Sequence, residues 1–179
     1  MIDIYLFRYS GEKESSKEFL KYALNESFSY NGEVEFLYGE KGKPYLKLNN
    51  DIYFNISHSG ECLVIALSDS EIGIDIERVR DVNFDIAKRF FCKEEYEYIS
   101  DDKEKFFNVW TMKESYVKYT GRGIADNFLN FSVVNTSTLR YSLKGCKFKQ
   151  YFLENDYVIS VCAGEDNFPE QIKIVEGII

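Results

Sequence analysis

The alternation of apolar and polar residues is clearest at residues 72–77, which read Ile-Gly-Ile-Asp-Ile-Glu. A period of two is typical of a strand, whose successive side chains point to opposite faces of a sheet. The three isoleucines are therefore expected to face the core, and Asp75 and Glu77 to share the other face with Gly73. Two carboxylates at positions i and i+2 of a strand lie about 6–7 Å apart, so both can reach one ion. So close together, they disfavour each other's charge unless a cation or a proton lies between them.

A second pattern has helical spacing. Residues 104–119 are expected to form a helix, which ends at Gly121 because glycine readily adopts the left-handed conformation at a helix C-terminus. At 100° per residue, Lys113, Glu114 and Lys118 lie on the same side of this helix. If helix and strand meet, three acids and two lysines converge, which would suit a divalent cation that holds a phosphate-rich substrate.

Each of these acids also has a plain structural interpretation. A solvated edge strand would explain Asp75 and Glu77. Ordinary surface pairs between acids and lysines on a helix would explain Glu114. The patterns alone leave both interpretations open.

Shorter patterns predict the remaining elements. Further strands are expected over residues 4–8, 34–38, 52–57, 62–68, 128–134, 139–143, 147–153 and 157–163, and further helices over residues 15–28, 85–91 and 93–99. Turns are expected at residues 10–11, 58–61 and 154–156, and a loop at residues 39–44.

The polar, charged segment at residues 78–83 is the expected boundary between two parts of the chain. Each part has helix and hairpin content. We therefore expect an α+β fold made of a pseudo-twofold pair of similar halves, residues 1–78 and 79–179, with a binding cleft between them.

Composition limits the possible functions. A chain of 179 residues that is 45% hydrophobic can bury a large core, and its formal net charge of −8 argues against nucleic acid as a partner. An anionic small ligand is still compatible, because a bound cation can reverse the local charge. No apolar run approaches the roughly 18 residues of a membrane span, and the N-terminus lacks a signal-peptide pattern. A cytoplasmic protein without membrane contact is expected.

Four cysteines occur without a Cys-x-x-Cys pair, and His58 is the only histidine. This spacing favours reduced, buried thiols over a disulfide or a metal site. A zinc site or a Ser-His-Asp triad would have few ligands to draw on.

A phosphate-binding candidate occurs at residues 54–60, which read Phe-Asn-Ile-Ser-His-Ser-Gly. Ser57, His58 and the turn amides could capture a phosphate, with Lys43 of a Gly-Lys-Pro loop nearby. Alternatively, serine and glycine satisfy the local backbone, and His58 packs against the protein.

Taken together, these motifs resemble one known family. Gly-Lys-Pro-Tyr at residues 42–45, the motif beginning at residue 54, the strand at residues 72–77 and Trp-Thr-Met-Lys-Glu-Ser-Tyr-Val-Lys at residues 110–118 closely resemble the 4′-phosphopantetheinyl transferases of the surfactin-synthetase-activating class. The resemblance runs from about residue 42 to residue 169. Any one motif is weakly specific, whereas four in this order with matching separations are highly specific.

The resemblance implies a fold, an activity and site residues. The family is a pseudo-twofold pair of α+β halves with coenzyme A and Mg²⁺ in the cleft. It transfers the phosphopantetheine arm of coenzyme A to a serine of an apo acyl or peptidyl carrier protein and releases 3′,5′-ADP. The implied magnesium ligands are Asp75, Glu77 and Glu114. The implied coenzyme A contacts are Lys43, Ser57, His58, Lys113 and Lys118.

The implied chemistry needs no activated nucleophile on this chain, because the attacking serine belongs to the carrier protein. The work is positioning and charge neutralisation, to which Lys113 and Lys118 contribute at the leaving phosphate. Glu114 is the candidate general base, directly or through a metal-bound water, and Glu95 is the competing acid. One chain supplies both walls of the cleft, so a monomer is expected.

The sequence departs from the family before the Gly-Lys-Pro motif. Members of this class usually carry a longer basic segment there, which helps to hold the adenosine 3′-phosphate. Here residues 1–41 precede the motif, and their basic residues are scattered: Arg8, Lys13, Lys17, Lys21 and Lys41. We expect the adenosine end to be held differently or more weakly.

An acidic carrier protein needs a local basic patch on this acidic chain. The candidates are Arg78, Arg80, Lys88 and Arg89, interleaved with Phe84, Phe90 and Phe91. The alternative is that the phenylalanines are core and the charges solvated.

Two other functions stay open: a catalytically silent module that binds coenzyme A or a nucleotide, and a plain interaction domain. The presence of all three acids with both helix lysines favours the transferase.

Overall fold

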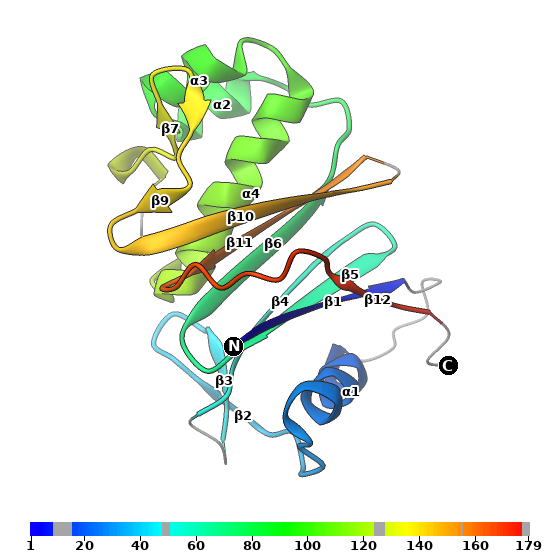
Figure 1. The fold of residues 1–179 in the computed structure, drawn as a ribbon. Coiled ribbons are helices and arrows are strands. Elements are labelled where there is room, and N and C mark those ends of the chain that lie inside the picture. The colour runs from blue at the N-terminus through cyan, green and yellow to red at the C-terminus, as the bar shows by residue number, and fades with distance from the viewer. Residues whose placement is uncertain (9–15, 48–50, 124–127, 155, 177–179) are drawn as a thin grey trace.

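Two β-sheets pack face to face in the protein, and a helix covers the outer side of each (Figure 1). The structure is a computed structural model that describes residues 1–8, 16–47, 51–123, 128–154 and 156–176. Its mixed helices and strands confirm the α+β class expected from the sequence.

The first sheet is built mostly from the N-terminal part of the chain. Its strands and the neighbouring elements are β1 (Ile2–Arg8), α1 (Ser16–Phe28), β4 (Tyr53–Ser59), β5 (Cys62–Ser68) and β12 (Lys173–Val175). The strand order is β12-β1-β5-β4. A separate small hairpin consists of β2 (Phe36–Tyr38) and β3 (Pro44–Leu46).

The second sheet has strand order β6-β11-β10-β9. These strands are β6 (Ile72–Arg78), β9 (Ser142–Leu143), β10 (Cys146–Leu153) and β11 (Tyr157–Ala163). The helices of this part are α2 (Asp85–Phe90), α3 (Lys93–Ile99) and α4 (Lys103–Thr120). A 3-10 helix, η2 (Phe128–Asn130), precedes the short pair β7 (Val134–Asn135) and β8 (Thr138–Leu139).

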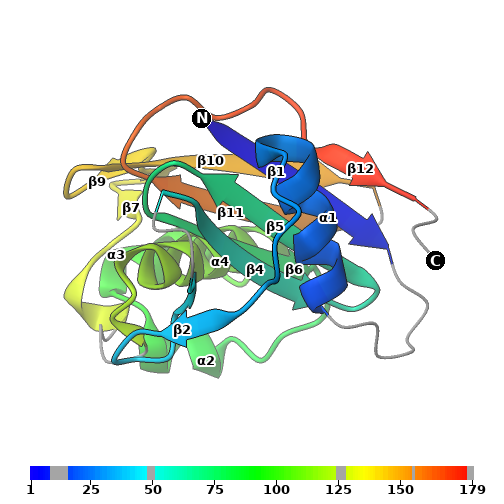
Figure 2. The same ribbon diagram turned by 90° about the horizontal axis from the view of Figure 1, so that it is seen from below.

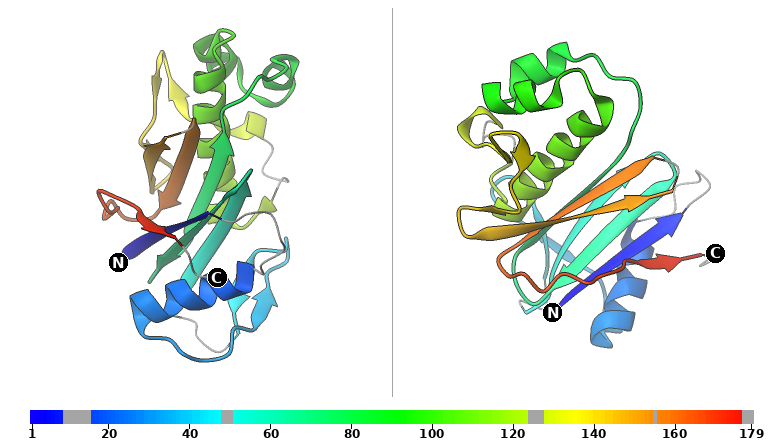
Figure 3. Two further views of the ribbon diagram at one scale, coloured as in Figure 1. Left: turned by 90° about the vertical axis from the view of Figure 1, so that its right-hand side faces the viewer. Right: turned by 45° about the horizontal axis from the view of Figure 1, so that its top comes forward.

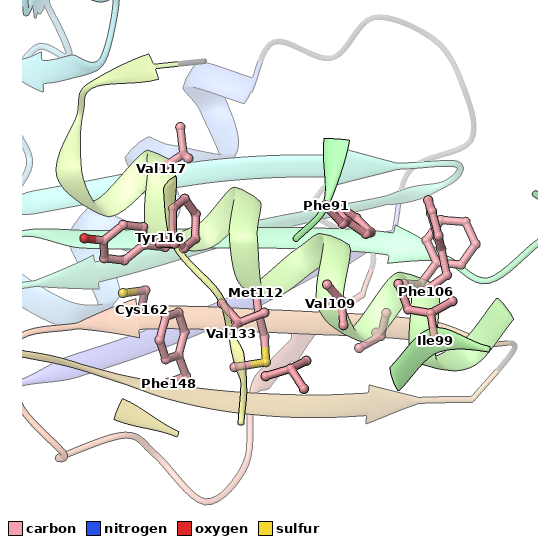
Figure 4. Packing of buried hydrophobic residues seen from close by; sticks show 14 of the residues in the cluster. Phe91, Ile99, Phe106, Val109, Met112, Tyr116, Val117, Val133, Phe148 and Cys162 are labelled. Atoms are coloured by element: carbon pink, nitrogen blue, oxygen red, sulfur yellow. The ribbon is translucent and has the colours of Figure 1, made fainter. Parts of the chain in front are cut away.

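Apolar periodicity explains the layers. The predicted stripe of α1, which includes Leu20 and Leu24, is buried against the outer face of the first sheet. The isoleucines of β6 join side chains of β1 and β5 in a core between the two sheets, as the alternation predicted. On the outer face of the second sheet, Met112 and Val117 of α4 belong to one cluster with Phe148 (Figure 4).

Strands β4 and β6 lie next to each other and hold the two sheets together along one edge (Figure 2). The backbone N–H of Ile74 donates to Asn55 Oδ1 at 3.0 Å, and Ser57 Oγ donates to Asp75 Oδ1 at 2.7 Å. Polar side chains of β4 therefore connect the strands and fix Asp75 beside β4.

Helix α4 lies directly on β6 because Gly73 has no side chain. A Cβ atom at this position would lie 2.1 Å from the carbonyl oxygen of Ser115 and 2.4 Å from the backbone nitrogen of Tyr119. Both separations are far inside van der Waals contact. The face of β6 that carries Gly73 and Asp75 is thus covered by α4 rather than exposed to solvent.

The strand expected over residues 128–134 is wrong. The segment instead forms η2 and reaches extended pairing only at β7. The carbonyl oxygen of Phe131 accepts from Lys113 Nζ at 2.6 Å and from Cys92 Sγ at 3.2 Å. Side chains therefore satisfy this backbone where a neighbouring strand would otherwise do so.

Other differences from the sequence patterns are small. The strand expected over residues 139–143 is divided between β8 and β9. The sequence does not predict β3 or β12, because three residues are too few to show a period. Residues 10, 11 and 155 of two expected turns lie outside the described residues.

The expected boundary falls in the irregular segment between β6 and α2. Each sheet nevertheless takes a strand from the other part of the chain. Strand β6 pairs with β11, and β12 runs parallel to β1 after the chain returns from β11 (Figure 3). The division into residues 1–78 and 79–179 stays a prediction.

Two further observations concern the described part of the chain. None of its helices is both long and apolar enough to cross a membrane. The four cysteines are free, and Cys62, Cys146 and Cys162 are buried.

The contact at Gly73 predicts that Gly73→Ala is strongly destabilising. The added methyl group must separate α4 from β6 or distort both, which is expected to lower the free energy of unfolding by about 3 kcal/mol or more. Denaturant unfolding measures this. Gly164→Ala is the matched control, because a Cβ there would meet only the Tyr119 hydroxyl at an ordinary 3.5 Å. Equal stability of the two variants would contradict the close contact.

Candidate active site

A pocket of about 280 Å³ lies where α4, β4 and the loop before β3 meet. Its lining includes Glu114 and Lys118 of α4, Asn55 and Ile56 of β4, residues 41–44, and Gly121 and Gly123. The polar groups that converge here come from elements far apart in the sequence.

Asp75 of β6 is bound to Lys118 of the pocket wall and is only 5% exposed. Its Oδ1 accepts from Lys118 Nζ and from Ser57 Oγ, each at 2.7 Å. Its Oδ2 is buried and has no hydrogen-bond partner among the described residues. A buried carboxylate oxygen without a partner is costly, so this atom is a position where a cation would be stabilising.

The pKa values of the acids reflect this environment. Burial raises the pKa of Asp75, against the opposing effect of Lys118. Burial also raises the pKa of the half-buried Glu114, and the negative charges of Asp75 and Glu77 raise it further. The negative charges that raise the pKa of Glu114 would be stabilised by a positive charge nearby.

The Glu77 carboxylate is less available to bind a cation than those of Asp75 and Glu114. Its Oε2 accepts from Arg80 Nη1 at 2.9 Å and from Ser59 Oγ at 3.0 Å. In the described ranges, no group of three or more His, Cys, Asp and Glu side chains is arranged so that it could hold a metal ion. The ligand set of Asp75, Glu77 and Glu114 stays a prediction, and Asp75 and Glu114 have the oxygens that are most available for a cation.

Lys118 joins the two sheets at the pocket wall. Its Nζ donates to Asp75 Oδ1, to Ser57 Oγ at 2.9 Å and to the Ile74 carbonyl at 3.1 Å. The side chain is 27% exposed and lines the pocket. Its position beside Asp75 brings together two residues that the sequence predicted for the site.

Lys43 has a structural position beneath the same pocket. Its ammonium group forms an ion pair with Glu71 and donates to the carbonyl oxygens of Ile72 and Tyr119 at 3.2 and 3.1 Å. Burial lowers the pKa of this lysine, while Glu71 opposes that shift. These contacts use all three ammonium protons, so the predicted phosphate contact of Lys43 would require a rearrangement.

Lys113 and Glu95 lie outside the pocket, contrary to their expected roles. Both side chains are 0% exposed, and Lys113 Nζ lies 2.8 Å from each carboxylate oxygen of Glu95. The aromatic ring of Phe131 lies 4.1 Å from the same ammonium group. Neither residue lines the pocket, so their expected contacts with coenzyme A and with a reacting proton stay predictions.

Ser57 and His58 point to opposite sides of β4, since they are consecutive residues of a strand. Ser57 faces Asp75 and Lys118. His58 is exposed and shares a side of the strand with Ile56, which lines the pocket.

Sequence reasoning missed two pocket residues. Asn55 binds the backbone of β6 through its side chain, and its motif indicated a phosphate turn rather than a strand contact. Lys41 lines the pocket from an irregular loop, where the only available signal is a basic residue beside Gly42.

The raised pKa of Glu114 predicts that Glu114→Gln stabilises the protein at pH 8 in the presence of EDTA. In the folded protein, the Glu114 carboxyl group holds its proton more tightly than it does in the unfolded chain. Stability is therefore lost as the pH rises from the ordinary pKa of 4.5 through the raised pKa. Glutamine avoids this loss, so the melting temperature should exceed that of wild type at pH 8. The difference should shrink toward pH 4.

Thermal unfolding across this pH range measures the effect. Glu170→Gln, at an exposed position, is the control and should follow wild type at every pH. A Glu114→Gln variant that is no more stable than wild type at pH 8 would contradict the charge repulsion inferred at this site.

Comparisons with known proteins agree with the resemblance seen in the motifs. The 4′-phosphopantetheinyl transferase superfamily matches residues 71–162. The 4′-phosphopantetheinyl transferase Sfp of Bacillus subtilis (strain 168) is 36% identical over 166 residues, which cover 87% of this chain and 72% of that protein.

Two further relatives cover less of the chain. The 4′-phosphopantetheinyl transferase gsp of Aneurinibacillus migulanus is 37% identical over 65% of this chain and 53% of its own length. The 4′-phosphopantetheinyl transferase HetI of Nostoc sp. (strain PCC 7120) is 41% identical over 52% of this chain and 44% of its own length. The chain therefore belongs to the 4′-phosphopantetheinyl transferase superfamily.

Proposed function

We propose that this protein transfers the 4′-phosphopantetheine group of coenzyme A to a serine of an apo acyl or peptidyl carrier protein. The observation that carries the proposal is that Glu114 and Lys118 line one pocket and that Lys118 binds the buried Asp75, in a chain of this superfamily. Relatives named 4′-phosphopantetheinyl transferases support the same activity.

The reaction balances without a nucleophile from this chain. The carrier serine oxygen forms a bond to the β-phosphorus of the pyrophosphate, and the bond from that phosphorus to the bridging oxygen breaks. The products are the holo carrier protein and 3′,5′-ADP. The serine proton goes to Glu114, the acid that lines the pocket.

The residues present fit a magnesium ion. Mg²⁺ is commonly held by one or two carboxylates together with waters and substrate phosphates, so Asp75 Oδ2 and the Glu114 carboxylate would suffice as protein ligands. When bound, the ion neutralises charge on the pyrophosphate. Glu77 contributes to the field at this site from its position beside Arg80.

The other pocket residues bind and orient the substrate. Lys118 holds Asp75 in place and presents a positive charge to the phosphate that leaves. The Ser57 hydroxyl donates to Asp75 and accepts from Lys118, and so holds these two side chains in position. His58 is exposed on the side of β4 opposite Ser57 and is our candidate for a further contact with coenzyme A.

The cellular setting follows from the same proposal. Described residues of one chain line the pocket, so a monomer is our proposed active form, and the cytoplasm is its proposed location. Neither nucleic acid nor a membrane has a role in it, and the acidic net charge agrees with this.

A patch on α2 is our candidate for carrier docking. We call Ile86, Lys88, Arg89 and Phe90 the α2 patch. Ile86 and Phe90 are 36% and 42% exposed, and the Arg89 guanidinium lies 5.2 Å from the Phe90 ring. Arg80, also expected in this surface, pairs with Glu77, and Phe91 is buried. Exposed apolar groups beside cations suit an acidic partner.

Arg89→Glu is expected to raise KM for the carrier protein about fivefold, the effect of an exposed charge pair worth up to roughly 1 kcal/mol. Affinity for coenzyme A should not change, because α2 does not line the pocket. Lys149→Glu on β10, an equal change of charge at an exposed position, should leave the KM for the carrier unaltered. Equal effects of the two variants would contradict docking at the α2 patch.

Loading of a carrier tests the activity itself. Wild-type protein, coenzyme A, Mg²⁺ and an apo carrier protein are incubated, and the carrier is weighed by mass spectrometry. A gain of one phosphopantetheine group is expected. Asp75→Ala and Glu114→Gln should each lower turnover by about 10²-fold or more, the loss typical of one preorganised electrostatic contact. No mass gain across several carriers would favour a silent module that binds coenzyme A or a nucleotide.

A further inference from the structure

A second cavity, of about 360 Å³, lies on the other side of α4 from the candidate active site. At 100° per residue, Tyr116 and Thr120 of its lining lie on the opposite side of the helix from Glu114 of the first pocket. The volume is typical of a site for a small molecule. The other described lining residues come from α4, the turn after it, residues 130–131 and the turn between β9 and β10: Tyr119, Arg122, Asn130, Phe131 and Lys144.

We propose that this second cavity binds a small aryl phosphate through Arg122 and Lys144. The site is distinct from the first pocket and does not depend on the transferase activity. Its described lining carries these two positive charges and no acidic side chain, although the chain as a whole has a formal net charge of −8. Both side chains belong to exposed residues, and neither forms an ion pair or a hydrogen bond with the residues that the structure describes.

The two charges favour a phosphate monoester as the anionic group. A phosphate monoester carries a charge between −1.5 and −2 near pH 7, whereas a single carboxylate would leave one of the two cations without a partner. The planar guanidinium of Arg122 matches the geometry of phosphate oxygens, and the ammonium group of Lys144 supplies three further donors. Asn130 is exposed at the same cavity and can add an amide donor.

Aromatic rings form a wall of the second cavity. Tyr116 and Phe131 are 7% and 6% exposed, and their ring centroids lie 4.6 Å apart. The backbone of Phe131 is fixed, because its carbonyl oxygen accepts from Lys113 Nζ at 2.6 Å. Half-buried Tyr119 adds a third ring. Rigid rings bind a flat apolar group at a small cost in conformational entropy, so a phosphate that carries an aromatic ring suits this lining better than inorganic phosphate.

The backbone holds Lys144 at the cavity in a conformation that lysine rarely adopts. Lys144 and Gly145 connect β9 to β10, and their φ angles are 47° and 88°. Two consecutive positive φ angles are typical of a type I′ turn, which favours asparagine, aspartate or glycine at its first position. A lysine there costs conformational energy, because its Cβ approaches the following carbonyl oxygen. Unfavourable backbone conformations of this kind are concentrated at ligand sites.

Arg122 connects the second cavity to the first pocket. Its neighbours Gly121 and Gly123 line the first pocket, whereas Arg122 lines the second cavity. A Cβ at Gly121 would lie 3.3 Å from Lys43 Cδ. A Cβ at Gly123 would lie 3.3 Å from Lys41 Cβ, so the turn packs directly on the loop of the first pocket. A ligand that binds Arg122 therefore also restrains the turn that forms one wall of the first pocket.

Titration of ¹⁵N-labelled protein with phenyl phosphate, followed by NMR, tests the site. The amide signals of Arg122, Asn130 and Lys144 should shift with one common Kd. Arg122→Gln and Lys144→Met should each raise this Kd about tenfold, as expected for the loss of a charge-assisted hydrogen bond. Arg122→Lys keeps the charge and should weaken binding less than Arg122→Gln does. No shift at these three amides at millimolar phenyl phosphate would overturn the site.

Two other ligands separate the roles of the charge and the ring. Inorganic phosphate and phenol should each bind at least about tenfold more weakly than phenyl phosphate, because each lacks one of the two groups that the lining recognises. Equal Kd values for inorganic phosphate and phenyl phosphate would overturn the assignment of an aryl ligand. Hydrogen exchange at the Gly121 amide, which donates to the Val117 carbonyl at 3.1 Å, should become slower with phenyl phosphate bound. Unchanged exchange there would overturn the restraint on the turn.

Lys41→Met is the matched control. It removes one positive charge from the first pocket and should leave the Kd for phenyl phosphate unaltered. If Lys41→Met raises this Kd as much as Arg122→Gln does, the phosphate occupies the first pocket and the assignment to the second cavity is overturned.

Discussion

The direct contact between α4 and β6 at Gly73 is the constraint on which the candidate site depends. Because no Cβ intervenes, Lys118 of the helix reaches Asp75 and the Ile74 carbonyl of the strand. The same closeness lets Lys43 bind the Tyr119 carbonyl of the helix and the Ile72 carbonyl of the strand. Widening this contact by one methyl group would lengthen all of these bonds together.

The acidic side chains of the site lower the stability of the folded protein. Asp75 is nearly buried, and one of its oxygens has no partner among the described residues, so burial raises its pKa. Burial and the neighbouring acids also raise the pKa of Glu114. Groups arranged in this way destabilise the folded state unless a ligand compensates, which is common where function rather than stability determines the residues. Binding of a cation would recover part of that stability.

Sequence patterns predicted the two elements that matter most, because both have strong periodicity. The β6 isoleucines and the α4 helix lie where their periods placed them. The angular position of individual lysines could not be predicted. Lys113 and Glu114 are neighbours, yet 100° of rotation directs one to Glu95 in the core and the other to the pocket. Which side of α4 faces the core depends on α3 and on residues 128–133, which pack against it.

The distribution of charge explains why short-range contacts must dominate substrate binding. The chain has a formal net charge of −8, so its overall field repels a polyanion such as coenzyme A. At physiological ionic strength, charges beyond about 8 Å are largely screened when exposed to solvent. The repulsion is therefore weak at the pocket, where a nearby ammonium group or metal ion acts with little screening.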